Sequence, residues 1–180
     1  MVELPDLRHS YASRDEPPHM SDLDSVTIES ATMDELDRLV ERWLELAAGQ
    51  REYGSQLQTA TNRSRIRDSF ARRIAGGQAR VARDGDRIVG FVTFTMEGST
   101  FSKSVQRGVV QNLYVEPESR SEGIGTRLLE AAERALIEAG ADAISLEAMA
   151  DNESARQFYR DRGYRPHRVT YEKSVENDTP

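Results

Sequence analysis

The chain has 180 residues, a length typical of a single domain that buries its own core without covalent cross-links. It contains no cysteine, which excludes disulfides, thiolate metal sites and cysteine nucleophiles. The net charge is −7 and the arginines are scattered along the chain, so a nucleic-acid partner is not expected, since phosphate backbones bind to concentrated basic surfaces.

The first 24 residues carry three prolines and mixed charge but few apolar side chains. A secretion signal would need an apolar segment there, and the chain has no apolar run of about 18 residues, the length of a membrane-spanning helix. We therefore expect a soluble, cytoplasmic protein without a membrane partner. We also expect residues 1–24 to form a flexible tail, residues 25–174 one domain, and residues 175–180 a short C-terminal tail.

The basic residues are almost all arginines. Two of the 24 are lysines, Lys103 and Lys173, and the other 22 are arginines, beside 31 acidic residues. An acidic, lysine-poor composition is typical of proteins that stay hydrated in high salt, and we hypothesise a salt-adapted host. Genomic base composition is the alternative explanation. An unfolding temperature that does not rise across a salt series would favour that alternative.

The first part of the domain predicts a strand followed by two helices. Residues 25–29 alternate apolar and polar side chains, as a half-buried strand does. Thr32 and Glu35 have the spacing of a capping box, and apolar residues then recur at helical spacing. After a polar, unperiodic stretch, Asn62 is the expected cap of a second helix, which two glycines end. Trp43 lies in the first apolar stripe, either as a core residue or as one wall of a substrate pocket.

The next part predicts a series of strands. Residues 78–83 and 87–96 are strand-like and are joined by Asp84-Gly85-Asp86, a turn typical of β-hairpins, so these two strands should pair antiparallel. Residues 107–115 predict a fourth strand, which runs directly into the glycine-containing turn of residues 115–126. That turn therefore leaves the end of a strand and enters a helix.

The turn of residues 115–126 predicts an anion site. Gly123 and Gly125 have no Cβ, so an anion can approach the main chain, and the following helix directs its unpaired amides and its positive end at the same place. With Arg120 beside them, these groups suit a diphosphate. The alternative is that the two glycines only permit a tight entry into the helix.

The last part predicts two helices and the end of the sheet. Apolar residues share one face of a predicted helix over residues 124–139. Residues 143–149 predict a short strand, residues 152–162 a helix that Asn152 opens, and residues 164–173 one or two terminal strands. The order of the elements predicts an α/β fold, a mixed sheet with helices on both faces.

Two motifs stand in order in the second half of the chain. They are Arg120-x-x-Gly123-x-Gly125 and Asn152-x-x-Ala155-x-x-Phe158-Tyr159-x-x-x-Gly163-Tyr164. Together they resemble the acetyl-coenzyme A signature of the GNAT (Gcn5-related) N-acetyltransferase family, and the order of elements is similar over residues 25–174. The motif spacing most resembles that of ribosomal-protein N-terminal acetyltransferase-like members.

The resemblance implies a fold and a reaction. The implied fold is a GNAT-like mixed α/β fold with a mostly antiparallel sheet of six to seven strands, helices on both faces, and fourth and fifth strands that splay apart to form the cofactor cleft. The implied reaction uses acetyl-CoA as cosubstrate and no metal, and transfers acetyl directly to a small-molecule amine or a peptide N-terminus in a ternary complex. His9, His19 and His167 lack the spacing of metal ligands. The terminal strands offer a surface for a homodimer, which nothing in the sequence specifies.

The resemblance also implies the residues that move protons. Tyr159 is the implied general acid that protonates the departing thiolate; the alternative is that Tyr159 and Phe158 only pack the helix onto the sheet. Glu147, twelve positions before Tyr159, is the implied general base, which burial near the pocket would tune. Ordered water, or a solvent-facing place for Glu147 on its strand, are the alternatives. Residues 108–112 contain no carboxylate, so the base that other branches of the family place on the fourth strand is not expected.

The implied cofactor site combines main-chain and side-chain groups. The fourth strand would hold the pantetheine arm, the amides of the turn would hold the diphosphate together with the Thr126 hydroxyl, and Asn152 would contact pantetheine or only cap its helix. The full set is Leu113, Tyr114, Val115, Arg120, Ser121, Glu122, Gly123, Ile124, Gly125, Thr126, Asn152 and Tyr159.

Two other classes of function compete with the transferase. A catalytically silent acetyl-CoA-binding sensor or regulatory module, which the family also contains, would keep the cofactor site, and Tyr159 argues against it. A dinucleotide-binding oxidoreductase is disfavoured, because Leu128 stands where the Gly-x-Gly-x-x-Gly motif has its third glycine.

Overall fold

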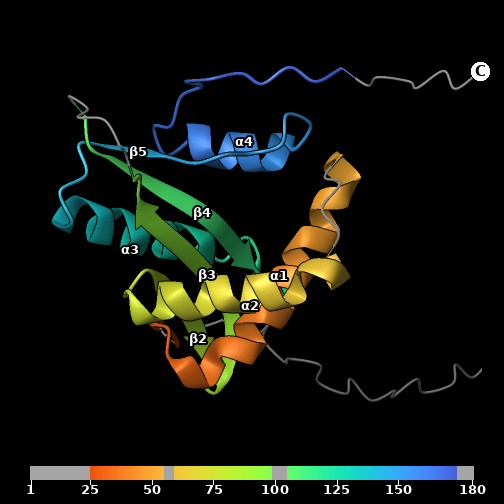
Figure 1. Ribbon diagram of the computed structural model, residues 1–180, viewed down its shortest axis with the longest axis vertical. Coiled ribbons are helices and arrows are strands. Elements are labelled where there is room, and N and C mark those ends of the chain that lie inside the picture. Colours follow the sequence, from red (N-terminus) through yellow and green to blue (C-terminus); the bar gives the residue numbers. More distant parts are fainter. Residues whose placement is uncertain (1–24, 55–58, 99–104, 174–180) are drawn as a thin grey trace, which may run out of the picture.

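The computed structural model describes residues 25–54, 59–98 and 105–173 (Figure 1). Short 3-10 helices precede and follow the first α-helix, at Met33–Glu35 and Arg51–Tyr53, and a third lies at Pro117–Ser119. In chain order the strands and α-helices are β1 (Val26–Ser30), α1 (Leu36–Gln50), α2 (Thr59–Ala75), β2 (Ala79–Asp84), β3 (Arg87–Met96), β4 (Arg107–Val115), α3 (Ile124–Glu138), β5 (Ala143–Ser145) and α4 (Glu153–Arg160).

The strands form one mixed sheet in the order β1-β2-β3-β4-β5. The first four strands pair antiparallel, and β5 pairs parallel with β4. The mixed, mostly antiparallel sheet is therefore confirmed. The predicted count of six to seven strands is wrong for the described residues, which form five.

The missing strands are those predicted for residues 164–173, which have no regular structure. Pro166 has no N–H to give to a ladder, and Val169 and Tyr171 alternate with polar residues and lie exposed, so a strand here would bury little apolar area. β5 also ends at Ser145, earlier than predicted. The homodimer predicted through these strands therefore has no paired strand to support it within the described part of the chain.

The N-terminal helices begin near their predicted positions. The Thr32 N–H donates to the Glu35 carboxylate at 2.7 Å, as in a capping box, and a 3-10 turn then passes into α1. α2 begins at Thr59, three residues before the predicted cap Asn62. No glycine or proline occurs within α2, so nothing in this stretch stops the helix from extending toward its N-terminus.

β2 and β3 form the predicted hairpin. Asp84 faces Arg87 across the pair, which leaves Gly85 and Asp86 as a two-residue turn. β3 lies at the centre of the sheet and is buried over most of its length. β3 pairs with β2 along one edge and with β4 along the other, so the hairpin holds the strand that positions β4.

Helices cover both faces of the sheet, as Figure 1 shows. α1 and α2 pack on one face, where the rings of Phe70 and Phe91 lie edge to face with centroids 5.5 Å apart. α3 packs on the other face, where its buried residues meet those of β2, β3 and β4. These residues include Leu128, Leu129, Ala132, Ala82, Val89, Val92 and Val110.

β4 and β5 separate after three residue pairs. Arg107, Gly108 and Val109 face Ala143, Ile144 and Ser145, and from Val110 to Val115 the strand β4 has no partner on that edge among the described residues. The splayed fourth and fifth strands implied by the resemblance are therefore confirmed. An unpaired strand edge presents main-chain N–H and C=O groups that an extended ligand can use.

β4 also carries an irregularity beside this separation. Thr93 of β3 faces Asn112, and the next residue, Phe94, faces Val110, so Gln111 is an extra residue on β4. Such a bulge bends the strand and changes where its main-chain groups point. The bend and the loss of β5 as a partner coincide in the middle of β4.

Candidate active site

The loop between β4 and α3 has the backbone shape of an anion site. Ser121 has a φ of +66°, the one positive value at a non-glycine position in the described ranges, and Gly123 has a φ of +80°. Left-handed residues in a loop turn neighbouring N–H groups toward one side, and α3 starts at Ile124 with unpaired amides of its own. The loop therefore gathers amide donors at the positive end of α3.

The start of this loop is tied to the sheet and to α1. The Arg120 Nε donates to the Val115 carbonyl oxygen at 3.1 Å, so its side chain folds back over the end of β4. Glu116, the residue after β4, is 4% exposed, and its carboxylate pairs with Arg42 of α1 and with Arg87 of β3, the latter at 2.9 Å. The role of Glu116 was not predicted from the sequence. The feature that could have indicated it is the place of an acidic residue directly after an apolar strand.

α4 approaches the first turn of α3. A Cβ on Gly125 would lie 3.5 Å from the Phe158 ring and 3.7 Å from the Val115 side chain, which are ordinary contact distances. Packing alone therefore does not require glycine at this position. The next residue, Thr126, accepts a hydrogen bond on its hydroxyl from the guanidinium of Arg162.

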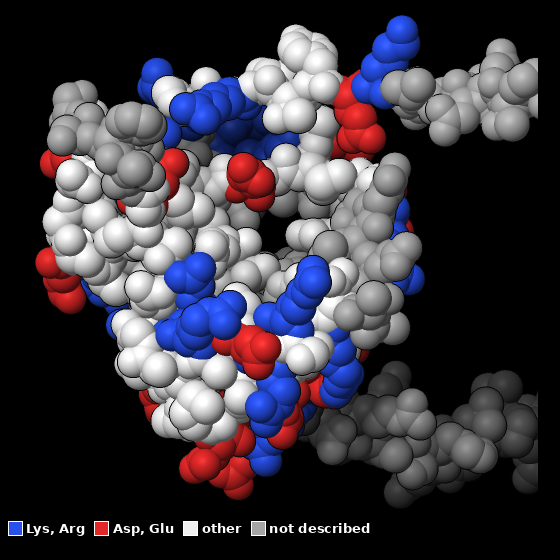
Figure 2. All heavy atoms as spheres, viewed as in Figure 1, with Lys and Arg blue, Asp and Glu red and all other residues white. Residues whose placement is uncertain are grey.

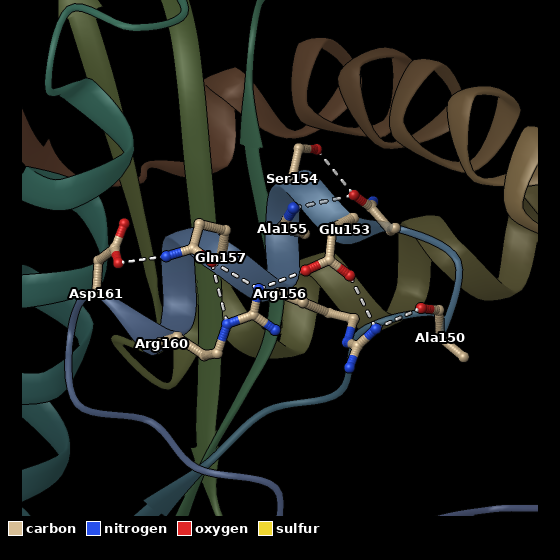
Figure 3. A network of polar contacts seen from close by, with 9 residues as sticks. Ala150, Glu153, Ser154, Ala155, Arg156, Gln157, Arg160 and Asp161 are labelled. Carbon is tan, nitrogen blue, oxygen red and sulfur yellow. Dashed lines mark hydrogen bonds and ion pairs between the residues drawn. The ribbon is translucent and has the colours of Figure 1, made fainter.

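Asn152 caps α4, because its side-chain oxygen accepts the Ala155 N–H at 3.0 Å. The outward face of the helix carries a network of polar contacts, in which Glu153 pairs with Arg156 at 3.0 Å and also with Arg160 (Figure 3). No residue of α4 is fully buried. The helix therefore lies on the body of the protein through half-buried side chains of its inner face.

Tyr159 lies on that inner face. Its ring is half-buried and lies edge to face with Phe158 and Tyr164, with centroid distances of 5.2 and 5.9 Å. Its hydroxyl has no hydrogen-bond partner within the described residues. Burial raises the pKa of the Tyr159 phenol, so the group stays protonated at neutral pH. The ring contributes to packing, and the hydroxyl keeps its proton available for donation.

The side chains of β4 alternate between the two faces of the sheet. Leu113 and Val115 pack, partly buried, against the cluster around α3. Tyr114 points to the opposite face, where it is buried and where its hydroxyl donates to Glu45 of α1. A cofactor role for Tyr114 is therefore restricted to its main chain.

Glu147 does not lie in an enclosed site. It is exposed, lies beyond the end of β5, and makes no hydrogen bond or ion pair with the described residues. Its segment continues to Met149, whose Cε lies 4.0 Å from the position of a Cβ on Gly54, just after α1. The chain thus crosses from β5 toward the end of α1 before it enters α4.

Trp43 links α1 to β4. Its Nε1 donates to the Asn112 side-chain oxygen at 3.0 Å, and the Asn112 amide donates to the Thr93 hydroxyl at 2.7 Å. The indole is half-buried against the core cluster between α1 and the sheet. Sequence reasoning did not single out Asn112 as its partner, because a contact across 69 positions leaves no local signal.

This face of the molecule is concave. Figure 2 shows a hollow between α4 and α1, where Figure 1 places the C-terminal part of β4, and Lys and Arg side chains gather on its α4 side. Asp or Glu atoms also lie at the edge of the hollow in Figure 2. The basic side chains on its α4 side, the unpaired strand edge and the amide-rich loop together suit an extended anionic ligand.

Among the residues that the structure describes, no helix combines the length and the apolar character that a bilayer crossing requires. Nor does any group of three or more His, Asp or Glu side chains among them stand close enough together to hold a metal ion. The cytoplasmic location stays a prediction.

The family described as acetyltransferase (GNAT) matches residues 39–164. This match covers more than half of the chain and includes the loop before α3 and the helix α4. The chain belongs to the GNAT family of acetyltransferases, as its two motifs indicated.

Two curated relatives are similar over part of the chain. N-alpha-acetyltransferase 30 of Schizosaccharomyces pombe is 36% identical over 87 residues, which cover 47% of this chain and 55% of that protein. The uncharacterized N-acetyltransferase YhfO of Bacillus subtilis is 38% identical over 76 residues, covering 41% of this chain and 51% of that protein. The chain thus matches about half the length of each curated relative.

Solved structures share the fold. A GCN5-related N-acetyltransferase from Ralstonia eutropha JMP134 superposes with a TM-score of 0.68 at 24% identity, covering 83% of this chain and 98% of that one. The aminoglycoside N-acetyltransferase AAC(6')-Iy, in complex with CoA, superposes with a TM-score of 0.66 at 13% identity, covering 83% and 94%. These likenesses confirm the GNAT-like fold.

Proposed function

We propose that this chain transfers an acetyl group from acetyl-CoA to a primary amine, with both substrates bound at the same time. One observation carries the proposal: the open edge of β4 leads directly into a loop with left-handed Ser121 and Gly123 at the start of α3. An extended arm that ends in a diphosphate matches this combination of a strand edge and an anion site.

The residues present fit acetyl-CoA along its length. The main chain of Val110 to Val115 offers hydrogen bonds to the amides of a pantetheine arm. The half-buried side chains of Leu113, Val115 and Phe158 offer apolar contact on the α3 side. The loop from Arg120 to Thr126 offers amides, one guanidinium and the hydroxyls of Ser121 and Thr126 to a diphosphate.

The proposed chemistry needs two proton transfers and no metal. Acetyl-CoA, when bound, supplies a thioester that a neutral amine can attack directly when the two are held together. As the nitrogen–carbon bond forms and the carbon–sulfur bond breaks, the Tyr159 hydroxyl donates its proton to the departing sulfur. Its raised pKa keeps that proton in place until it is needed.

The amine must lose a proton before or during the attack. We propose Glu147 as the acceptor, acting directly or through an ordered water. Its exposed position on the segment between β5 and α4 supports the second route, because a chain of water can carry the proton to solvent. β4 offers no carboxylate for this role between Gly108 and Asn112.

We propose two classes of acceptor, a peptide amino terminus and a small amine. The first is supported by the relative named as an N-alpha-acetyltransferase, which is 36% identical over the matched part. The second is supported only by fold, through aminoglycoside acetyltransferases at 13% and 16% identity. The peptide amino terminus is therefore the first class to test.

The test is release of free thiol from acetyl-CoA in the presence of an amine panel: peptides with free and with blocked amino termini, a polyamine, an aminoglycoside and single amino acids. The proposal predicts turnover on at least one free amine and none on the blocked peptides. Tight binding of CoA without turnover on any amine would instead favour the silent sensor. Absence of CoA binding would contradict both functions.

A further inference from the structure

We propose that Arg162, just beyond the C-terminal end of α4, is a further cofactor-binding residue whose guanidinium binds the diphosphate of acetyl-CoA. It would act from the α4 side of the loop, while Arg120 acts from the β4 side. This inference rests on the proposed function and extends it to a residue outside the loop.

Three contacts hold the Arg162 side chain at the first turn of α3. Its Nη2 donates to the hydroxyl of Thr126, the third residue of α3, and its Nη1 donates to the Phe158 carbonyl oxygen at 2.8 Å. Its Cζ lies 3.6 Å from the centroid of the Phe158 ring, within the range of a cation–π contact. The positive charge is therefore fixed beside the amide-rich end of α3.

The charge of Arg162 has no acidic partner among the described residues, and its Nε is buried without a hydrogen-bond partner there. The positive end of α3 opposes a cation at this place, whereas the Phe158 carbonyl in the last turn of α4 favours one. Arg156 and Arg160 of α4 differ in this respect, since both pair with Glu153 on the outward face of the helix (Figure 3). A bound anion would compensate both the charge and the helix end.

The hydrogen bond from Arg162 also determines whether the Thr126 hydroxyl can act as a donor. A threonine hydroxyl has one proton to donate and two lone pairs that accept. Because one lone pair accepts from Arg162, the proton is available for a neighbouring acceptor, and the hydroxyl is held in place by a charged donor. Arg162 thereby positions Thr126 as a donor toward an anion at the start of α3.

Position 162 is one of the unspecified positions in the motif Phe158-Tyr159-x-x-x-Gly163-Tyr164. The sequence signature therefore does not single out this arginine. Folding of α4 onto α3 is what brings it to Thr126, 36 positions away in the chain.

The experiment compares three ligands that differ in their phosphates: CoA, dephospho-CoA, which keeps the diphosphate, and pantetheine, which has neither phosphate group. Binding is measured by calorimetry, and turnover with the corresponding acetyl thioesters. The variants are Arg162→Gln and, as a matched control, Arg160→Gln, which removes one arginine of the outward network. Arg162→Met, which keeps the length and the contact with the Phe158 ring, replaces the glutamine variant if that variant does not fold.

We expect Arg162→Gln to weaken binding of CoA and of dephospho-CoA by about tenfold or more, since it removes a charge-assisted contact. Turnover of acetylpantetheine should stay within about threefold of wild type, and Arg160→Gln should stay within about twofold for every ligand. Equal losses for all three ligands would mean that Arg162 acts through packing and would overturn the inference.

Two other outcomes also overturn it. A loss confined to CoA, with dephospho-CoA unaffected, would place the contact on the 3'-phosphate rather than on the diphosphate. Unchanged affinity for CoA in a folded Arg162→Gln variant would show that the Arg162 guanidinium does not bind the diphosphate. Failure of the wild-type protein to bind CoA would be a different result, because it would overturn the proposed function itself.

Discussion

The hydroxyl of Tyr114 on β4 donates a 2.5 Å hydrogen bond to the carboxylate of Glu45 on α1. Tyr114 is 4% exposed, and its ring stacks on Phe91 with centroids 5.7 Å apart. Beside this contact, Arg42 of α1 pairs with both Glu45 and Glu116. α1 is therefore fixed to one face of β4, the strand whose edge on the β5 side is open beyond Val109.

The Tyr114 contact predicts how stability depends on pH in the alkaline range. Burial, and then the hydrogen bond with Glu45, raises the pKa of Tyr114 in the folded protein, whereas an unfolded tyrosine ionises near its ordinary value of about 10. The stabilisation is therefore complete below about pH 10 and is lost as the pH rises above it. Melting temperatures measured from pH 8 to 11 should fall less steeply for Tyr114→Phe than for wild type. Parallel curves would contradict this assignment.

Tyr159→Phe tests the proposed general acid. Loss of the phenolic proton donor should lower kcat by about 10² to 10⁴, the usual contribution of a positioned acid. The affinity for CoA should stay within about threefold, because the ring and its packing against Phe158 remain. Tyr171→Phe, at a position that is 92% exposed, is the matched control and should retain wild-type kcat. An unchanged kcat in Tyr159→Phe would assign the ring to packing alone.

Glu116→Gln tests the anchor at the start of the loop. The carboxylate is buried and accepts from Arg87 and Arg42, whose own side chains are 68% and 31% exposed and can be rehydrated. Loss of the charge should therefore destabilise the protein by about 1–3 kcal/mol, less than the loss of a fully buried pair. Glu118→Gln, an exposed neighbour, should change stability by less than about 0.5 kcal/mol. Urea unfolding gives both values, and equal midpoints for the two variants would contradict the anchoring role.

Asn112→Ala tests the link between α1 and the sheet. The change removes the acceptor of the Trp43 indole and the donor to the Thr93 hydroxyl, and Thr93 is only 2% exposed. We expect a loss of about 1–3 kcal/mol in the free energy of unfolding, because a buried polar group is left unpaired. Gln111→Ala, at the exposed bulge position, is the control for stability and should lie within about 0.5 kcal/mol of wild type. If Asn112→Ala were as stable as Gln111→Ala, the hydrogen bonds of Asn112 with Trp43 and Thr93 would contribute nothing to the free energy of unfolding.

Local features of the fold could be predicted because their signals are local. The capping contact of Thr32 with Glu35, the two-residue turn after Asp84 and the cap at Asn152 each depend on side chains within three positions of one another. The separation of β4 and β5 was implied by the family resemblance rather than by the residues. Gly123 was predicted only as a position where an anion can approach the main chain, and the structure adds that its backbone is left-handed, a conformation that glycine adopts at little energetic cost.

Other features depend on contacts that no short stretch of sequence contains. Glu116, Asn112 and Arg162 each gain their partners from elements far away in the chain. One or two terminal strands were predicted over residues 164–173, but a strand also needs a neighbour and an apolar face, and the exposed Val169 supplies neither. Glu147 was proposed as the base from the resemblance of its spacing to Tyr159, and that spacing contains no signal of its exposure, which depends on how the segment after β5 folds.

The two ends of α3 offer the most direct test of the central claim, that the loop before this helix binds the diphosphate of CoA. Gly123 at its start and Gly140 after its end have φ values of +80° and +91°, so alanine at either position strains the backbone by about 1 kcal/mol. The deciding measurement is calorimetric titration of CoA into wild type, Gly123→Ala and Gly140→Ala. The account predicts that wild type and Gly140→Ala bind within about twofold of each other and that Gly123→Ala binds at least about tenfold more weakly. Equal affinities in both variants, or no binding by the wild type, would contradict it.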